Sequence, residues 1–271
     1  MAHAKKFVIQ AVAGIAVVAA AASGAMAAGN VSVTISPTNQ LIVVGDGADN
    51  DVTISGTAST AIYEVTGNNG TTINGSASAL TTGVANREIF IEMLSGNDTV
   101  SIVDATFTRT VEITFGSAVN SLSMNNVVMN KNLKLLMGLG TNSVNFMNTE
   151  ITEPSKIQTD DGMDTIEFDN VEYRGGIFTK DGNDIVTILN SHHVDPKGKL
   201  VIKTGNDQDD IEVTNAVWEG KILVNAGAGN DTVIAGGVDV GVKAKFTGSG
   251  DVDSLTNNGG HVGAVQFSAF E

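Results

Sequence analysis

Short runs of alternating apolar and polar residues recur along the chain, and each follows a corner that contains glycine and an Asn or Asp. LSGNDTVSI at 94–102, DGMDTIEF at 161–168, KDGNDIVTI at 180–188 and AGAGNDTVI at 226–234 are four examples. Alternation with a period of two indicates strands that bury every second side chain. Long helical periodicity is missing, so the pattern predicts an all-β protein.

Aligning these runs reveals a repeat of about 22 residues, in which an Asn or Asp, here called the anchor, holds one equivalent position. The anchors are Asn50, Asn69, Asp98, Asn120, Asn142, Asp164, Asp184, Asp209, Asp231 and Asp253. Two residues after the anchor stands an almost wholly apolar position, which includes Val100, Leu122 and Val144. Six residues after it stands Gly, Asn or Asp, types that tolerate the left-handed backbone of a tight corner.

Three short strands separated by turns fill one repeat, and such a coil buries its apolar side only by stacking on its neighbours. The sequence therefore predicts one domain, a parallel β-helix (β-solenoid) of about ten rungs with about 22 residues and three strands per rung. We expect it to be right-handed, because parallel crossovers nearly always are. Insertions at 76–88 and 191–198 are predicted loops, and Val265, Phe267 and Ala269 predict a last strand or cap.

The amino-terminal segment has the pattern of a signal peptide. Lys5 and Lys6 precede an apolar run that ends at Ala25-Met26-Ala27, a small-x-small cleavage pattern. We predict a signal peptide at 1–27 and the solenoid at 28–271, hence a secreted or cell-surface protein with no membrane span after processing. A retained membrane anchor is the alternative.

The charge of the chain bears on its partners. The net charge is -15, and removal of residues 1–27 with their two lysines and no acids makes it -17. Such a chain is expected to avoid nucleic acid and to attract cations. The 15 Lys and Arg residues form no standout basic cluster along the sequence, and no cysteine is present for a disulfide.

Acidic residues gather at the anchor corner in the second half of the chain. From residue 164 onward every anchor is Asp, and the acidic turns are expected to line up along an outer seam of the rod. Carboxylates one rung apart repel by about 1 kcal/mol per pair in water, so a neutralising partner is expected. The candidate metal ligands at this corner are Asp160, Asp161, Asp164, Asp181, Asp184, Asp207, Asp209, Asp231, Asp251 and Asp253.

The stretch AGAGNDTVI resembles the glycine-rich nonapeptide of the repeats-in-toxin (RTX, hemolysin-type calcium-binding) family. Gly227, Gly229, Asp231 and Val233 fall on its pattern G-G-x-G-x-D-x-U-x. The resemblance implies Ca²⁺ as a cofactor, held by Asp carboxylates and backbone carbonyls. The RTX motif repeats every nine residues, whereas this chain has one such corner per 22. The alternative is that the corners are turns alone.

No catalytic set stands out in the sequence. His192 and His193 beside Asp195 are one candidate metal or acid-base group, and the alternative is that they line the loop and wall. Tyr173 and Trp218 are expected to pack inside or to form a sugar-stacking platform. We therefore predict a non-enzymatic, adhesin-like or layer-forming structural protein that self-associates or meets a cell-surface or polysaccharide partner. A polysaccharide-binding or polysaccharide-cleaving β-helix is the alternative, and the Thr and Ser rows are too irregular for an ice-binding face.

Overall fold

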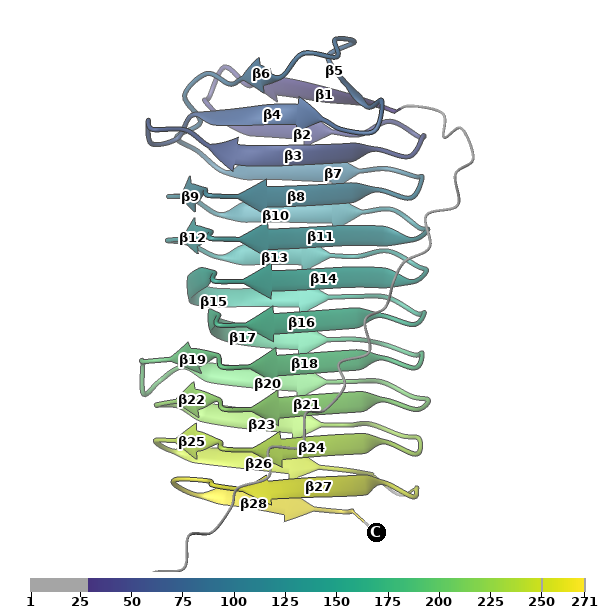
Figure 1. The fold of residues 1–271 in the computed structure, drawn as a ribbon, viewed down its shortest axis with the longest axis vertical. Coiled ribbons are helices and arrows are strands. Elements are labelled where there is room, and N and C mark those ends of the chain that lie inside the picture. The colour runs from purple at the N-terminus through teal and green to yellow at the C-terminus, as the bar shows by residue number, and fades with distance from the viewer. Residues whose placement is uncertain (1–28, 250, 271) are drawn as a thin grey trace, which may run out of the picture.

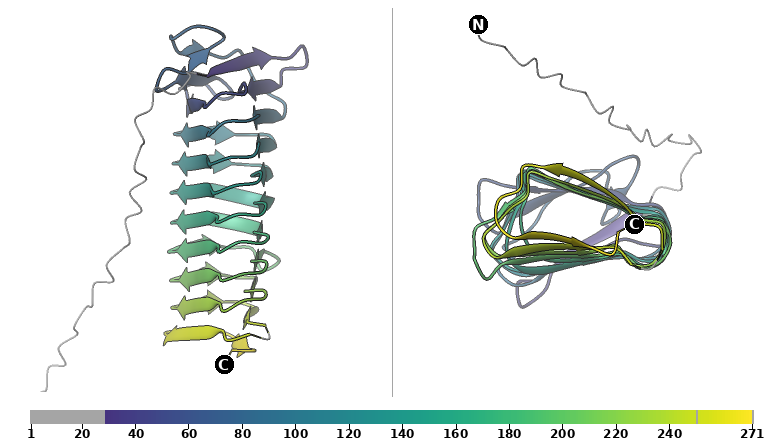
Figure 2. Two further views of the ribbon diagram at one scale, coloured as in Figure 1. Left: turned by 90° about the vertical axis from the view of Figure 1, so that its right-hand side faces the viewer. Right: turned by 90° about the horizontal axis from the view of Figure 1, so that it is seen from below.

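The computed structural model describes residues 29–249 and 251–270, and the predicted signal peptide at 1–27 lies outside them. Within these residues the chain is all-β and forms a β-solenoid of about eight turns. The strands stack rung on rung along one axis, as Figure 1 shows. Seen along that axis, successive turns superimpose in an elongated closed outline (Figure 2).

The first column of strands forms one side of the solenoid, and every neighbouring pair in it is parallel. It consists of β2 (Leu41–Val44), β7 (Ile89–Met93), β10 (Val111–Phe115), β13 (Leu133–Leu136), β15 (Glu150–Gln158), β17 (Glu172–Phe178), β20 (Lys199–Lys203), β23 (Lys221–Asn225), β26 (Lys243–Thr247) and β28 (Val265–Ser268). The alternating burial of β10, with Val111, Ile113 and Phe115 inside, is typical of this column.

The second column lies on the other side of the core and is also parallel throughout. It consists of β3 (Asp51–Gly56), β8 (Thr99–Val103), β11 (Asn120–Asn125), β14 (Asn142–Met147), β16 (Thr165–Asp169), β18 (Ile185–Leu189), β21 (Asp210–Thr214), β24 (Thr232–Gly236) and β27 (Ser254–Gly259). Val100, Leu122 and Val144 stand directly above one another and are fully buried. The predicted register is thus confirmed.

A third, shorter column closes each turn between the other two. It comprises β9 (Thr106–Phe107), β12 (Val128–Met129), the first residues of β15 and β17, β19 (His192–His193), β22 (Val217–Trp218) and β25 (Asp239–Val240). Its inward side chains meet those of the second column, where Phe146 stacks on Phe168 at 5.1 Å between ring centroids. Phe168 in turn meets Tyr173 edge-on at 5.1 Å.

The prediction of a second rung anchored on Asn69 is wrong. After β3 the chain reverses, so that β4 (Tyr63–Gly67) pairs antiparallel with β3, and β6 (Leu80–Thr81) pairs antiparallel with β4. β1 (Asn30–Ile35) runs antiparallel to β2 and parallel to β5 (Thr72–Ile73). These strands cover the amino-terminal end of the stack (Figure 1). Because these residues form a cap and not rungs, the solenoid has about eight turns and not the ten that the alignment predicted.

The carboxyl-terminal end of the stack is less enclosed. β28 continues the first column through the pairs Ala244–Val265 and Phe246–Phe267, so the predicted last strand is confirmed. Val265 and Phe267 are only partly buried, and Ala269 is exposed with a φ of 58° rather than inward-facing. No helix of the described residues has the length and apolarity needed to cross a membrane.

Candidate functional site

The anchor side chains form a continuous polar file inside the solenoid, at the corner that leads into the second column. At every step of this file except that from Asn120 to Asn142, and leaving aside Asn69 in the cap, the Oδ1 atom of one anchor accepts the backbone N–H of the anchor on the preceding rung. At the excepted step Asn142 Oδ1 accepts from Asn120 Nδ2 at 3.4 Å. Representative N–O distances are 2.9 Å from Asp164 to Asp184, 2.9 Å from Asp184 to Asp209 and 3.0 Å from Asp209 to Asp231. Asp164, Asp184, Asp209, Asp231 and Asp253, here called the aspartate ladder, are at most 1 % exposed.

The Asn anchors and the Asp anchors satisfy this corner differently. The Nδ2 atom of Asn142 donates to the carbonyl oxygen of Gly138 at 2.9 Å, and that of Asn120 donates to Gly116 at 2.9 Å. In Asp184 and Asp209, as in the other ladder residues up to Asp231, the second carboxylate oxygen Oδ2 is buried without a hydrogen-bond partner. In the repeat, Oδ2 of these Asp anchors is equivalent to the donating Nδ2 atom of the Asn anchors. A carboxyl group can donate the corresponding hydrogen bond only when it is protonated.

Burial raises the pKa of four ladder carboxyl groups, those of Asp164, Asp184, Asp209 and Asp231, because a charged carboxylate is poorly solvated there. The pKa of Asp209 rises to about 7, and those of Asp184 and Asp231 rise to about 6. Neighbouring ladder residues add to this effect, as Asp164 does for Asp184. The pKa of Asp164 is raised by burial as well. The hydroxyl groups of Thr179 and Thr204 act against burial, because they favour the charged forms of Asp184 and Asp209. Burial is the larger effect, so we predict that the ladder takes up protons as the pH falls through about 7 to about 6.

The other predicted metal ligands lie outside the core, on the outer turn of the same corner. Asp161, Asp181, Asp207 and Asp251 are exposed, and the carboxylate of Asp160, which is partly buried, pairs with the Lys180 ammonium. The ten candidate residues thus separate into the five of the aspartate ladder and these five outer ones.

The outer carboxylates are partly engaged by the turn itself. Asp181 Oδ1 accepts from Asn206 Nδ2 at 2.7 Å, and Asp251 Oδ2 accepts the Gly229 N–H at 3.2 Å. Calcium takes six to eight oxygen ligands, so a site here would need backbone carbonyls as well. Among residues 29–249 and 251–270, no three acidic or histidine side chains are grouped closely enough to hold a metal ion. Calcium binding stays a prediction.

A second file of polar side chains runs along the opposite corner, outside the core. From the anchor Asp98 onward, the residue six positions after each anchor has a left-handed backbone. The φ values are 56° at Asn126, 50° at Asn148 and 55° at Asn170. Asn126 Nδ2 donates to Asp104 Oδ1 at 2.7 Å, and Asn170 Nδ2 donates to Asn148 Oδ1 at 2.8 Å. The predicted corner chemistry is confirmed, and the Asn side chains link neighbouring rungs.

The histidine candidate belongs mainly to the wall of the third column. His193 is 2 % exposed, and its Nδ1 lies 3.4 Å from Glu172 Oε1. Burial lowers the pKa of His193. Asp195 instead pairs with Arg174 at 3.1 Å. Trp218 is fully buried beside His193, so a sugar-stacking platform at this position is wrong.

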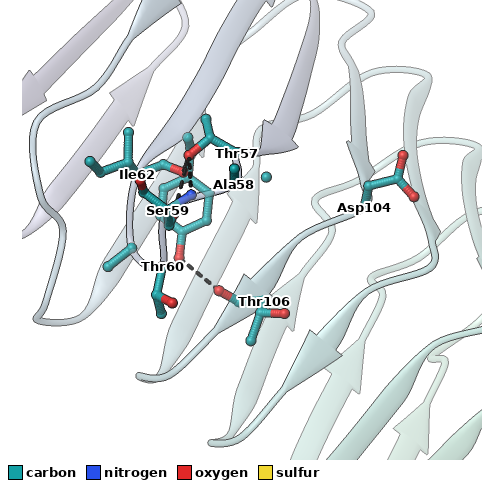
Figure 3. Close-up of a pocket in the computed structure, with 10 residues that line it drawn as sticks. Thr57, Ala58, Ser59, Thr60, Ile62, Asp104 and Thr106 are labelled. Carbon is teal, nitrogen blue, oxygen red and sulfur yellow. Dashed lines mark hydrogen bonds between the residues drawn. The ribbon is translucent and has the colours of Figure 1, made fainter.

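A small pocket of about 100 Å³ lies at the reversal between β3 and β4 (Figure 3). Its lining includes the hydroxyl groups of Thr57, Ser59 and Thr60, while Asp104 lies apart from them (Figure 3). The Tyr63 hydroxyl donates to the carbonyl oxygen of Thr106 at 3.0 Å. These contacts attach the cap to the first full turn of the solenoid.

Sequence reasoning missed a grouping of lysines. Lys199, Lys221 and Lys243 are 22 residues apart, so the register places them directly above one another on β20, β23 and β26. These lysines do not form a contiguous basic segment in the sequence, but the spacing between them equals the length of the repeat. They were detectable by the same alignment that found the anchors.

No family model matches the sequence, and we found no match among curated proteins or among solved structures.

Proposed function

We propose that the chain is an exported, acidic, non-enzymatic structural module of the cell surface or extracellular matrix, built as a right-handed rod. One observation supports this role above the others. The recurring polar residues of both corners are used to join one rung to the next, through buried carboxyl and amide groups inside and Asn side chains outside. Repeats that serve their own stacking are typical of an architectural element.

Export and surface location can be tested directly. An epitope-tagged full chain would be produced in a bacterium with a general secretion pathway, and cells would be fractionated and labelled with antibody without permeabilisation. We expect a product that begins at Ala28 or Gly29 and is accessible on intact cells or in the medium. Retention of the unprocessed chain in the cytoplasm would contradict the proposal.

The competing role is cleavage of an acidic polysaccharide. Purified mature protein would be incubated overnight with polygalacturonate and alginate, and reducing ends and unsaturated products would be measured. We expect no increase over a heat-denatured control. Release of either product by the native protein alone would replace the structural role with a lyase or hydrolase role.

We further propose that Ca²⁺ stabilises the acidic corners in the manner that the RTX resemblance implies. The support is chemical: carboxylates and glycine-turn carbonyls are the ligands that calcium takes. The melting temperature would be measured at pH 8 with calcium and with excess chelator. We expect calcium to raise it by mass action. Equal midpoints would remove calcium from the proposal and leave protons as the neutralising partner of the aspartate ladder.

A further inference from the structure

Five lysines gather on one outer surface of the first strand column. Lys199, Lys221 and Lys243 form one row along the rod, and Lys203 and Lys245 stand on β20 and β26 in the neighbouring rows. We call these five residues the lysine face. Parallel strands are about 4.8 Å apart, so the three lysines of the row follow one another at about that interval.

The lysine face has no counter-charge of its own. β20, β23 and β26 contain no Asp or Glu, although the whole chain has a net charge of -15. In the described part of the chain, Lys and Arg form ion pairs at Lys134, Arg174 and Lys180, and none of these includes a lysine of the face. Glu219, at the corner before β23, is also absent from those pairs. Five ammonium groups in one area repel one another unless an external anion is present.

An apolar groove runs between the basic residues. Val201 and Leu223 stand above one another on the outer side of β20 and β23, and Lys245 follows them on β26. Val201 is only 9 % exposed, whereas Leu223 is half-buried. They line a groove of about 280 Å³ together with Lys203, Asn225 and Thr247. The groove thus combines an aliphatic floor, two lysines, and amide and hydroxyl groups that can bind hydroxyls. The row of Lys199, Lys221 and Lys243 lies outside the groove lining, two residues earlier on the same three strands.

We propose that the lysine face binds a linear acidic polysaccharide, laid along the rod axis with its carboxylate or sulfate groups on the lysines. The sugar rings would rest on Val201 and Leu223, and their hydroxyls would meet Asn225 and Thr247. The row of lysines matches a polymer that carries its charges at regular intervals. This inference rests on the proposed role as a surface module and names its partner.

Two other anionic occupants fit less well. A nucleic acid carries denser charge, which the acidic remainder of the molecule repels, and the three strands offer no outward aromatic side chain on which bases stack. A second copy of the chain would have to present its outer acidic turn. In that turn Asp160 is paired with Lys180, Asp181 with Asn206 and Asp251 with the Gly229 N–H, so Asp161 and Asp207 are the two exposed acids left for five lysines.

The test compares two triple variants of the full mature chain with equal charge. Lys199→Gln/Lys221→Gln/Lys243→Gln removes the row, and Arg87→Gln/Arg109→Gln/Lys131→Gln removes three exposed cations elsewhere that, in the described part of the chain, belong to no ion pair. Each changes the net charge of the mature chain from -17 to -20. Binding to polygalacturonate, heparin, neutral dextran and single-stranded poly(dT) would be measured by calorimetry at two salt concentrations. All substituted side chains are exposed or half-buried, and equal melting temperatures would establish that the variants fold.

We expect salt-sensitive binding of polygalacturonate or heparin, weakened about tenfold or more in the row variant and less than twofold in the control. Polygalacturonate and heparin distinguish carboxylate from sulfate as the anion. Equal binding by both variants, equal binding of dextran, or preference for poly(dT) would overturn the proposal. A row variant that loses self-association but still binds polysaccharide would also overturn the proposal. The proposed surface location is tested by antibody labelling of cells, and the proposed polysaccharide binding is tested by calorimetry. Failure of one proposal is therefore distinguishable from failure of the other.

Discussion

At the scale of single residues, the anchor corner explains why Asn and Asp are the types that recur. An Asn anchor accepts the N–H of the preceding rung and donates to a carbonyl oxygen of its own turn, as Asn120 does. An ionised Asp can only accept, which leaves one buried oxygen without a donor. A buried polar group without a partner costs about 1–3 kcal/mol, and a buried charge costs more. The raised pKa values follow from this cost.

Asp209 is the residue at which this account is most sharply tested. Asp209→Asn restores an amide that needs no proton, so we expect a higher melting temperature at pH 8, equivalent to about 1–2 kcal/mol of added stability, and a smaller gain at pH 5. Asp209→Ala removes the acceptor of the Asp184 N–H and is expected to cost about 1–3 kcal/mol at both pH values. Thermal melts of the three proteins would check the order. A destabilised Asn variant at pH 8 would contradict the proposed protonation.

The sequence predicted the position of these residues but not their environment. Spacing alone identified Asp164, Asp184 and Asp209 as equivalent. It suggested an external acidic seam, because a turn with Gly and Asp is normally exposed. The structure buries the anchors and leaves Asp161 and Asp181 outside. Which acid of a turn points inward depends on the path of the stacked backbone, and that path is a tertiary property.

At the scale of elements, the corners limit which residues allow rungs to stack. Gly140, Gly162, Gly182 and Gly229 all have positive φ values. At each of them an added Cβ would collide with a backbone carbonyl oxygen of the preceding rung. These glycines therefore serve both the turn conformation and the close approach of neighbouring turns.

Gly182→Ala tests this dual requirement. The Cβ would meet the carbonyl oxygen of Gly162, and the backbone at a φ of 138° disfavours any side chain. We expect a loss of about 2 kcal/mol or more in unfolding free energy. Gly83→Ala is the matched control, because its Cβ would stand 3.6 Å from Ile35 Cγ1 in ordinary contact. Denaturant unfolding of both variants would be compared, and equal losses would show that the rung contact has no special effect.

The cap shows where sequence reasoning about elements failed. The segment around Asn69 has the residue types of a rung corner, because Thr71 and Gly75 stand two and six residues after it, as in the repeat. In the structure Asn69 has a φ of 48° in an exposed turn that follows an antiparallel strand. Hairpin turns and solenoid corners use the same residues for the same backbone reason. Only the pairing direction of β4 distinguishes them.

At the scale of the whole molecule, the ladder makes stability depend on pH in a definite direction. The folded pKa values of Asp184, Asp209 and Asp231 lie above the ordinary value of about 4. The folded state therefore binds more protons than the unfolded state between about pH 4 and 7, and stability falls as pH rises through that window.

Melting temperatures across this range would check the prediction. We expect the protein to be more stable at pH 5 than at pH 8 by about 3 kcal/mol or more, without added calcium. The Asp209→Asn variant should show a weaker pH dependence than the wild type. A flat profile, or a maximum above pH 7, would contradict the raised pKa values.

The distribution of charge over the whole molecule could be read from the sequence only in part. Net charge correctly indicates an acidic protein, yet it hides the lysine face, because Lys199 and Lys243 are separated by 44 residues. The fold brings them to one surface two rungs apart. The composition of the chain predicts the sign of its net charge. The register of the repeat is needed to predict which surface carries the opposite charge.

The two ends of the rod differ, and this difference gives its unfolding a direction. Antiparallel strands cover the first rung, whereas β27 and β28 present one edge to solvent with Val265 and Phe267 incompletely buried. Because each turn depends only on its neighbours, loss of the last turn exposes the next one to the same loss. Amide protons of β27 should thus exchange with deuterium first and those of β11 much later, so that the molecule frays progressively from one terminus.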